Sequence, residues 1–213
     1  MENMITAEEY FRLKAQSYLR MAKPHCYIMP GITPHNDFLF ISCYYHQLVA
    51  AYSYFGVDKN LLFANYTSEY SFSKEKKLAV NEKRIKSVEE FEIITGIRET
   101  VSHKSDDIVQ ECIDSIKSEN PIIIAADCFY LPYRETTFNI SHMQHYLLVY
   151  GFDSVSKTFT VMDHMHQNSY IYSSKELKYN ELRNAFNTCS ELFAKDNNRG
   201  TSKNGIRIVK KVV

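Results

Sequence analysis

The chain has 213 residues, yet only six are glycine, none is tryptophan, and neither sign of charge is in excess. Twenty-five basic residues balance 25 acidic ones, whereas proteins that neutralise nucleic-acid phosphates usually carry a basic excess, so we expect no nucleic-acid partner. The few glycines form no glycine-rich loop of the kind that cradles phosphates, which argues against a nucleotide-dependent enzyme. These absences favour a neutral globular protein.

Long apolar runs and closely spaced cysteine pairs are also missing. No stretch approaches the roughly 18 apolar residues of a membrane-spanning helix. The first residues, MENMITAEEYFRLKAQ, are charged and lack the apolar segment of a secretory signal. The five cysteines are an odd number without a CxxC pair, which is typical of a reduced chain. We therefore expect a cytoplasmic protein with no membrane contact.

The patterning of apolar residues predicts an α+β fold. No linker or repeat divides the sequence, so we expect one domain over residues 1–213, with a mainly helical lobe over 1–120 and a mainly antiparallel sheet lobe over 121–213. Helices are predicted at 6–21, 43–55, 58–64, 87–96 and 105–120 and near 175–187, and strands at 70–72, 122–127, 145–151, 158–163, 169–173 and 205–213.

The segment 74–86 concentrates basic residues between two of these elements. A solvated loop is the simpler interpretation, and a docking patch for an acidic partner is the alternative. Its cations are Lys74, Lys76, Lys77, Lys83, Arg84 and Lys86.

Cys43 occupies a chemically distinctive position among the cysteines. Ser42 is a candidate N-cap and Gly56 a stop signal, so Cys43 falls in the first turn of a helix that is apolar on nearly all sides. The free N–H groups and the helix dipole there favour a thiolate over a thiol. Of the others, Cys112 and Cys128 are predicted to be packing residues, and Cys26 to line a cleft.

A thiolate nucleophile also needs a base and a group that orients the base. His145 begins one predicted strand and Asp163 ends the next, with a turn centred near residues 154–155. Reflecting His145 through that centre places Asp163 directly opposite it or diagonal on the same face, about 5 to 8 Å away between Cβ atoms. The spacing therefore favours a histidine–carboxylate pair.

Together these residues resemble a known superfamily. Ser42-Cys43 enters a helix ending in Tyr-Phe-Gly, and ADCFYLPYRETTFNISHMQHYLLVYGFD is followed by FTVMDH. Over residues 36–165 this is similar to the papain-like cysteine peptidases, in the branch of the bacteriocin-leader peptidases and the butirosin-biosynthesis acyltransferase N-terminal domain. A narrower likeness is to the amide synthases of closthioamide-type thioamide nonribosomal peptide assembly.

The resemblance implies a papain-like fold and a Cys–His–Asp triad made of Cys43, His145 and Asp163. Papain-like peptidases usually place an oxyanion-stabilising glutamine six residues before the nucleophile, and this sequence has Asp37 there. Either Asn36 takes that role or backbone N–H groups do, including that of Cys43. A thioester tolerates a poorer oxyanion hole than an amide, so the departure favours thioester substrates.

Other histidines offer alternatives. His46 lies one turn after Cys43 and is more simply a packing neighbour. A metal set is conceivable, but His145 cannot serve both as ligand and as general base, so we expect no metal and no bound cofactor. The candidate ligands are His142, His145, Asp163, His164 and His166.

We expect an amide-forming acyltransferase that accepts an acyl or peptidyl group from the phosphopantetheine arm of a carrier protein and passes it from Cys43 to a small amine or diamine. The first alternative is a cysteine peptidase that trims a peptide or leader. The second is an inactive binding module of the same fold.

Overall fold

The computed structural model describes Thr6 and residues 25–37, 42–72, 77–165, 169–193 and 205–212. The helix expected over 6–21 lies outside these residues. The helices are α2 (Cys43–Tyr54), α3 (Lys59–Ala64), α4 (Val88–Thr95), α5 (Ile108–Lys117) and α6 (Tyr179–Phe193), with the 3-10 turn η1 (Cys128–Tyr130). The strands are β1 (Cys26–Ile28), β2 (Tyr66–Phe72), β3 (Leu78–Arg84), β4 (Ile97–Ser102), β5 (Ile122–Asp127), β6 (Gln144–Asp153), β7 (Thr158–Asp163), β8 (Ser173–Lys178) and β9 (Ile206–Lys211).

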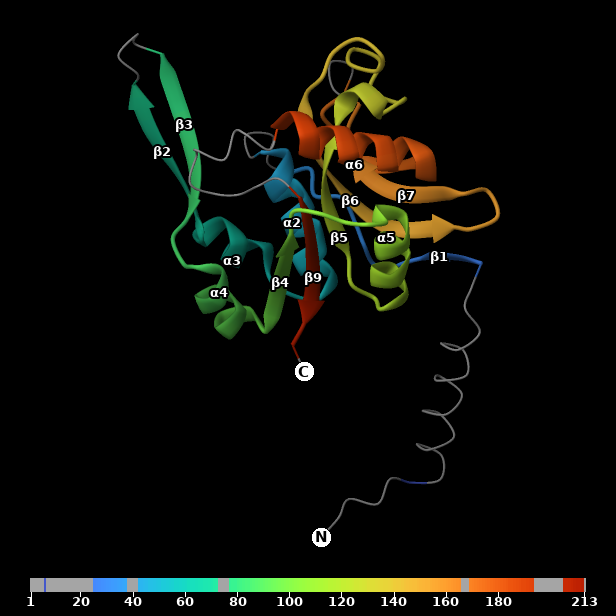
Figure 1. The fold of residues 1–213 in the computed structure, drawn as a ribbon. Helices are drawn as coiled ribbons and strands as arrows, with labels where there is room; N and C mark the ends of the chain where they lie inside the picture. The colour runs from blue at the N-terminus through green and yellow to red at the C-terminus, as the bar shows by residue number, and fades with distance from the viewer. Residues whose placement is uncertain are drawn as a thin grey trace.

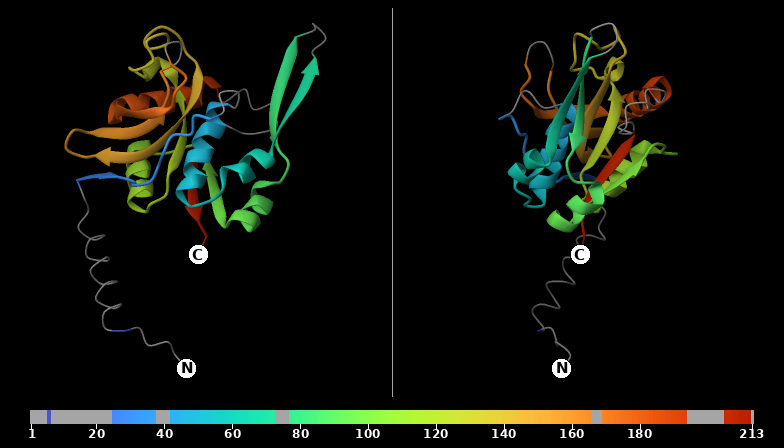
Figure 2. Two further views of the ribbon diagram at one scale, coloured as in Figure 1. Left: turned by 180° about the vertical axis from the view of Figure 1, so that it is seen from behind. Right: turned by 90° about the vertical axis from the view of Figure 1, so that its left-hand side faces the viewer.

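Seven strands form one antiparallel sheet in the order β4-β9-β5-β6-β7-β8, and β1 pairs with the far end of β6. Both central strands, β5 and β6, are buried along almost their whole length, as expected for strands covered on both faces. Helices α5 and α6 cover one face and α2 lies toward the other (Figures 1 and 2). This arrangement confirms the α+β prediction and is consistent with a papain-like fold; the domain boundaries remain a prediction.

The basic segment is not the loop that its charges suggested. Residues 78–84 form β3, which pairs with β2 in a separate two-stranded hairpin. Lys83 on β3 pairs with Glu69 on the neighbouring β2 at 2.5 Å, so the charged residues of this part of the segment lie on paired strands rather than in a turn. The hairpin projects from the body of the molecule (Figure 1). Its outer part exposes Tyr70, Phe72, Leu78 and Val80.

Other strands also differ from the sequence prediction: β1 was not predicted, and β2 begins at Tyr66 rather than at residue 70. β4 was not predicted, since its buried face alternates Ile97 with the charged Glu99 and so hides the apolar period of a strand. The strand expected at 169–173 lies at Ser173–Lys178 instead. That strand is mostly polar because it is the sheet edge, where only Leu177 is buried. The last helix correspondingly begins at Tyr179.

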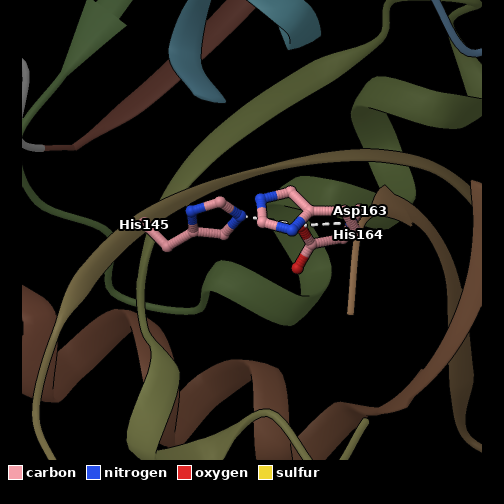
Figure 3. A group of neighbouring side chains, drawn as sticks. All are labelled: His145, Asp163 and His164. Carbon is pink, nitrogen blue, oxygen red and sulfur yellow. Dashed lines mark hydrogen bonds and ion pairs between the residues drawn. The ribbon is translucent and has the colours of Figure 1, made fainter. Parts of the chain in front are cut away.

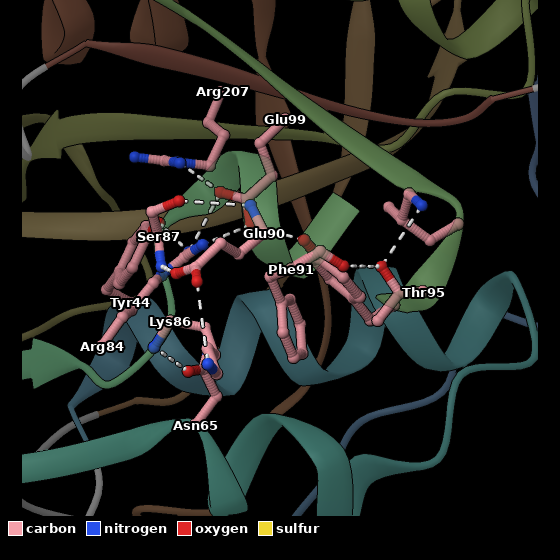
Figure 4. A network of polar contacts seen from close by, with 12 residues as sticks. Tyr44, Asn65, Arg84, Lys86, Ser87, Glu90, Phe91, Thr95, Glu99 and Arg207 are labelled. Atoms are coloured by element: carbon pink, nitrogen blue, oxygen red, sulfur yellow. Dashed lines mark hydrogen bonds and ion pairs between the residues drawn. The ribbon is translucent and has the colours of Figure 1, made fainter. Parts of the chain in front are cut away.

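Glu99 is the centre of a buried polar network that attaches the hairpin to the sheet (Figure 4). Its carboxylate accepts hydrogen bonds from Arg84 at the end of β3, from Arg207 on β9, and from the Tyr52 hydroxyl at 2.5 Å. Arg84 also donates to the Tyr44 hydroxyl on α2. One carboxylate thereby joins β3, β4, β9 and α2.

Among the described residues, no helix has the length and apolar character that crossing a bilayer requires. The expected cytoplasmic location remains a prediction.

Candidate functional site

Cys43 is the first residue of α2, as the sequence indicated. Ser42 occupies the N-cap position with extended backbone, but its side chain makes no capping hydrogen bond. Within the described part of the chain, the buried Ser42 hydroxyl has no partner. The N–H groups of the first turn, which have no acceptor within a helix, are therefore not used by a side-chain cap.

The thiol of Cys43 contacts His145 and the backbone of Tyr146. Burial alone would raise the pKa of Cys43, but the positive charge of His145, a hydrogen bond with that imidazole and a hydrogen bond with the Tyr146 backbone lower it below its usual value. The charge of Asp163 opposes this decrease only in part. The environment therefore favours a thiolate, the nucleophilic form of cysteine.

His145 also bonds Asp163, so it contacts both a thiol and a carboxylate. The Nε2–Oδ1 distance is 2.7 Å, and both side chains are buried (Figure 3). The β6–β7 register pairs Leu148 with Met162, so Asp163 lies diagonal to His145 rather than directly opposite. Desolvation would lower the pKa of His145, but the charges of Asp163 and Cys43 raise it to about 9. Because Nε2 bonds the carboxylate, Nδ1 is the ring atom left for the thiol.

Asp163 has two further side-chain partners that the sequence analysis missed. The Tyr133 hydroxyl donates to Oδ2 at 2.9 Å, and Arg134 Nη1 lies 3.2 Å from both carboxylate oxygens. The N–H of His164 donates to Oδ1 at 2.7 Å. Burial favours the protonated acid, yet the imidazole of His145 and the guanidinium hold the pKa of Asp163 below its usual range. Both missed residues stand in an irregular loop, where no periodicity indicates what they contact.

Gln47 connects the cysteine helix to the two strands. It lies one turn after Cys43, is completely buried, and donates from Nε2 to the carbonyl oxygens of Tyr146 and Met162, each at 3.1 Å. The backbone of Tyr146 also makes a hydrogen bond with the Cys43 thiol, which lowers the pKa of that thiol. One glutamine therefore sets the distance between the helix start and the strands that carry His145 and Asp163.

Asn36, the candidate oxyanion donor, holds the backbone of Tyr172. Its Nδ2 donates to the Tyr172 carbonyl at 3.1 Å, and its Oδ1 accepts from the Tyr172 N–H at 2.8 Å. One Nδ2 hydrogen is left over, so these contacts do not test the oxyanion role, which remains a prediction. The neighbouring Asp37 is exposed and bonds Lys59 at 2.5 Å.

The remaining histidines are placed in different surroundings. His46 is buried, stacks on Tyr172 and bonds the His35 carbonyl at 3.0 Å, which fits the packing interpretation. His142 bonds the buried Asp127 at 2.6 Å. His164 packs edge-on against His145, and His166 lies outside the described residues.

Among the described residues, His145, Asp163 and His164 bring three potential metal-ligand atoms within 4.8 Å of one another. The donor chemistry does not suit a cation, because Asp163 already accepts hydrogen bonds from Tyr133, Arg134, His145 and the His164 backbone. A metal ion would have to share this carboxylate with a guanidinium at 3.2 Å. We derive no metal-dependent step from this group.

The other cysteines lack the features of Cys43. Cys112, Cys128 and Cys189 are buried, and burial raises the pKa of each, to about 12 for Cys128 and Cys189. Cys26 is exposed and pairs with Asp153, at the opposite end of β6 from His145. Cys26 therefore does not line this site, contrary to the prediction.

A comparison with protein-family models identifies the family of this chain. The model described as butirosin biosynthesis protein H, N-terminal, matches residues 54–164, more than half of the sequence. The chain belongs to this family. The part of this chain that matches the family model includes Tyr133, Arg134, His145 and Asp163, whereas Cys43 lies eleven residues before the match begins. No curated protein matches the chain. The narrower likeness to closthioamide-type amide synthases remains a prediction.

Proposed function

We propose that the protein is a cysteine-dependent acyltransferase that forms amides through an acyl-enzyme on Cys43. The supporting observation is the position of this thiol at the uncapped start of α2, with a lowered pKa caused by contact with His145, itself bonded to the buried Asp163 at 2.7 Å. Membership of a family named for butirosin biosynthesis protein H is consistent with a biosynthetic transfer reaction.

The proposed reaction has two halves. The Cys43 thiolate attacks the carbonyl carbon of a thioester, the carbon–sulfur bond of the donor breaks, and His145 gives its proton to the departing thiolate. An amine then attacks the new thioester on Cys43, His145 takes a proton from the amine, and the Cys43 thiolate leaves. Asp163 stabilises the imidazolium and keeps Nδ1 directed at the thiol.

The oxyanion of each tetrahedral intermediate needs donors close to Cys43. The backbone N–H of Cys43, in the first turn of α2, is the first candidate, with the remaining Nδ2 hydrogen of Asn36 as the second. Asp37, at the position where papain-like peptidases carry glutamine, is exposed and paired with Lys59. This arrangement favours a thioester over a peptide as substrate.

We propose that the acyl donor is carried on the phosphopantetheine arm of a carrier protein and that the acceptor is a small amine. The basic segment offers a weaker docking patch than its charge count suggests. Lys83 pairs with Glu69, Arg84 with Glu99, and Lys86 with Glu90. Lys74 and Lys76 lie outside the described residues. The exposed apolar residues of the outer hairpin are therefore better candidates for the contact with the carrier than the paired cations. They are Tyr70, Phe72, Leu78 and Val80.

The test is to incubate the protein with a carrier-bound acyl thioester, a small thioester without the carrier, and several diamines, and to measure intact masses. We expect an acyl adduct on Cys43, amide products, and faster reaction of the carrier-bound donor. Cys43→Ala should abolish the adduct, whereas the matched Cys26→Ala variant should react like the unmodified protein because Cys26 is remote from His145.

Three results would contradict the proposal. Release of free acid only, whatever amine is offered, would indicate a hydrolase. Turnover of peptides in place of thioesters would indicate the peptidase alternative. Absence of selective alkylation of Cys43 by a thiol reagent near neutral pH would indicate the inactive binding module.

A further inference from the structure

The Asp163 carboxylate serves two cations at once. His145 occupies one side at 2.7 Å and Arg134 bridges both oxygens at 3.2 Å. Arg134 is 1% exposed, which makes it the largest fully buried side chain among the described residues. In the proposed reaction only the imidazole needs the carboxylate, so the guanidinium needs a separate explanation.

Stability explains the guanidinium poorly. A buried ion pair gains little over apolar residues of equal size, since desolvation of both charges offsets their attraction. Here the pair is also incompletely satisfied, because Arg134 Nε is buried without a partner in the described part of the chain. An unsatisfied buried donor adds further cost, which a purely structural pair would have no reason to keep.

The surrounding loop holds Arg134 in place through its main chain. The N–H of Arg134 donates to Leu131, and its carbonyl accepts from the N–H groups of Thr137 and Phe138. The neighbouring Tyr133 hydroxyl donates to the same carboxylate. Backbone turns therefore hold this loop between β5 and β6, and the loop places the Arg134 guanidinium and the Tyr133 hydroxyl against Asp163.

We propose that Arg134 is a positioning residue, which shares the Asp163 carboxylate with His145 and thereby limits how strongly that carboxylate holds the imidazole in its protonated form. The inference rests on the proposed function for its catalytic meaning, but its geometry is independent of the substrate. An imidazole that must both accept and donate protons works best when its pKa lies near the operating pH. A carboxylate serving His145 alone would move that pKa further from neutrality.

Several titratable groups surround the Asp163 carboxylate and the His145 imidazole. They are Cys43 on α2, Cys128 in η1, Tyr133 and Arg134 in the loop, His145 on β6, His164 after β7 and Tyr172 before β8. The charges of His145, Arg134 and His164 favour the ionised form of Asp163 and so lower its pKa.

The test measures the His145 titration by NMR in the unmodified protein, in Arg134→Met and in Arg134→Lys. Loss of the guanidinium should raise the pKa of His145 by about 1 unit above its value of about 9. The lysine variant should restore most of the original titration, since it keeps the charge. In acyl transfer, Arg134→Met should lower kcat near neutral pH with little change in KM and should move the alkaline limit of the pH profile upward.

A merely structural role predicts the opposite direction. If Arg134 only holds the loop, its loss would loosen the His145–Asp163 contact and move the pKa of His145 down toward 6.5, which would overturn the proposal. An unchanged titration in a folded Arg134→Met variant would also overturn it. Arg84→Met, which removes a guanidinium from the separate Glu99 network, is the matched control and should leave His145 unaffected.

If Arg134→Met does not fold, Tyr133→Phe provides the second variant. It removes one hydrogen bond to Asp163 and keeps the ring, so the pKa of His145 should rise by a smaller amount. The titration requires no acyl transfer, so failure of the proposed function leaves this measurement valid, and failure of this inference leaves the transferase assay unaffected.

Discussion

Gln47 offers a direct test of how the candidate site is assembled. Its side chain is completely buried, and Nε2 donates to the carbonyl oxygens of Tyr146 and Met162 at 3.1 Å. The backbone of Tyr146 also makes a hydrogen bond with the Cys43 thiol. We predict that Gln47→Leu both destabilises the fold and lowers the reactivity of Cys43.

The magnitude follows from the groups left behind. Leucine has a similar volume and leaves no large cavity, but two buried carbonyl oxygens lose a donor, at a cost of about 1–3 kcal/mol each. The Gln47 Oε1 is itself buried without a partner among the described residues, so its removal returns about 1 kcal/mol. The free energy of unfolding should therefore fall by about 1–5 kcal/mol.

Urea unfolding measures the stability, and the rate of alkylation of Cys43 at fixed pH measures the site. Gln110→Leu is the matched control, because the Gln110 side chain is exposed and donates to Asp114 at 2.8 Å on the surface of α5, so its stability change should stay within about 0.5 kcal/mol. A Gln47→Leu protein as stable as the original would refute the reasoning. So would a destabilised variant that alkylates at the original rate.

Two further predictions concern stability. Glu99→Gln should lower the free energy of unfolding by about 3 kcal/mol, because it leaves Arg84 and Arg207 without their buried carboxylate, whereas Glu92→Gln, in the solvent-screened pair with Arg98, should have a much smaller effect. Burial raises the pKa of Glu99, but the two guanidinium groups lower it overall, so this contribution is present above pH 4.5 and should vanish in urea titrations as the pH falls through the folded-state pKa. Gly151→Ala should cost about 1–3 kcal/mol by the same assay, since a Cβ there would lie 2.9 Å from both Ile28 and Thr160; an unchanged midpoint would show that these side chains can move aside.

A register shift beside Gly151 affects how His145 and Asp163 lie relative to each other. The strand register shifts between Val149 and Gly151, where β1 joins the edge of β6. Without that one-residue shift Asp163 would lie opposite Leu148 and face the other side of the sheet from His145; with the shift it lies opposite Leu147, diagonal to His145 on the same face. A hairpin centre estimated from turn residues cannot detect such a bulge, because the bulge lies inside the strand and not in the turn.

Charge patterns misled the sequence analysis wherever charges turned out to be paired. Glu99 interrupts the apolar face of β4, and in β3 the charged Glu82 and Arg84 follow Leu78 and Val80 at alternate positions, so neither strand showed an apolar period. The partners of Glu99 and Arg84 come from other elements, which composition cannot reveal. The helix that begins at Cys43 was predictable because its signals, a serine before it and a glycine after it, are local.

The contacts around Cys43 divide into two parts of different origin. The base side is supplied by one continuous stretch, in which the loop after β5 provides Tyr133 and Arg134, β6 provides His145, and β7 ends at Asp163. This stretch lies wholly within the residues that match the butirosin protein H family. The thiol comes from α2, whose first eleven residues precede the match.

The two parts meet at the backbone of Tyr146, which bonds the Cys43 thiol and accepts a hydrogen bond from Gln47 through its carbonyl. A displacement of α2 would therefore change the thiol–imidazole distance without disturbing the His145–Asp163–Arg134 contacts. Conversely, a change at Arg134 would alter the proton affinity of His145 without moving α2. The Gln47 and Arg134 variants should therefore change the His145 titration in opposite directions: Gln47→Leu slows alkylation of Cys43 and weakens the thiol contact that raises the pKa of His145, whereas Arg134→Met raises that pKa.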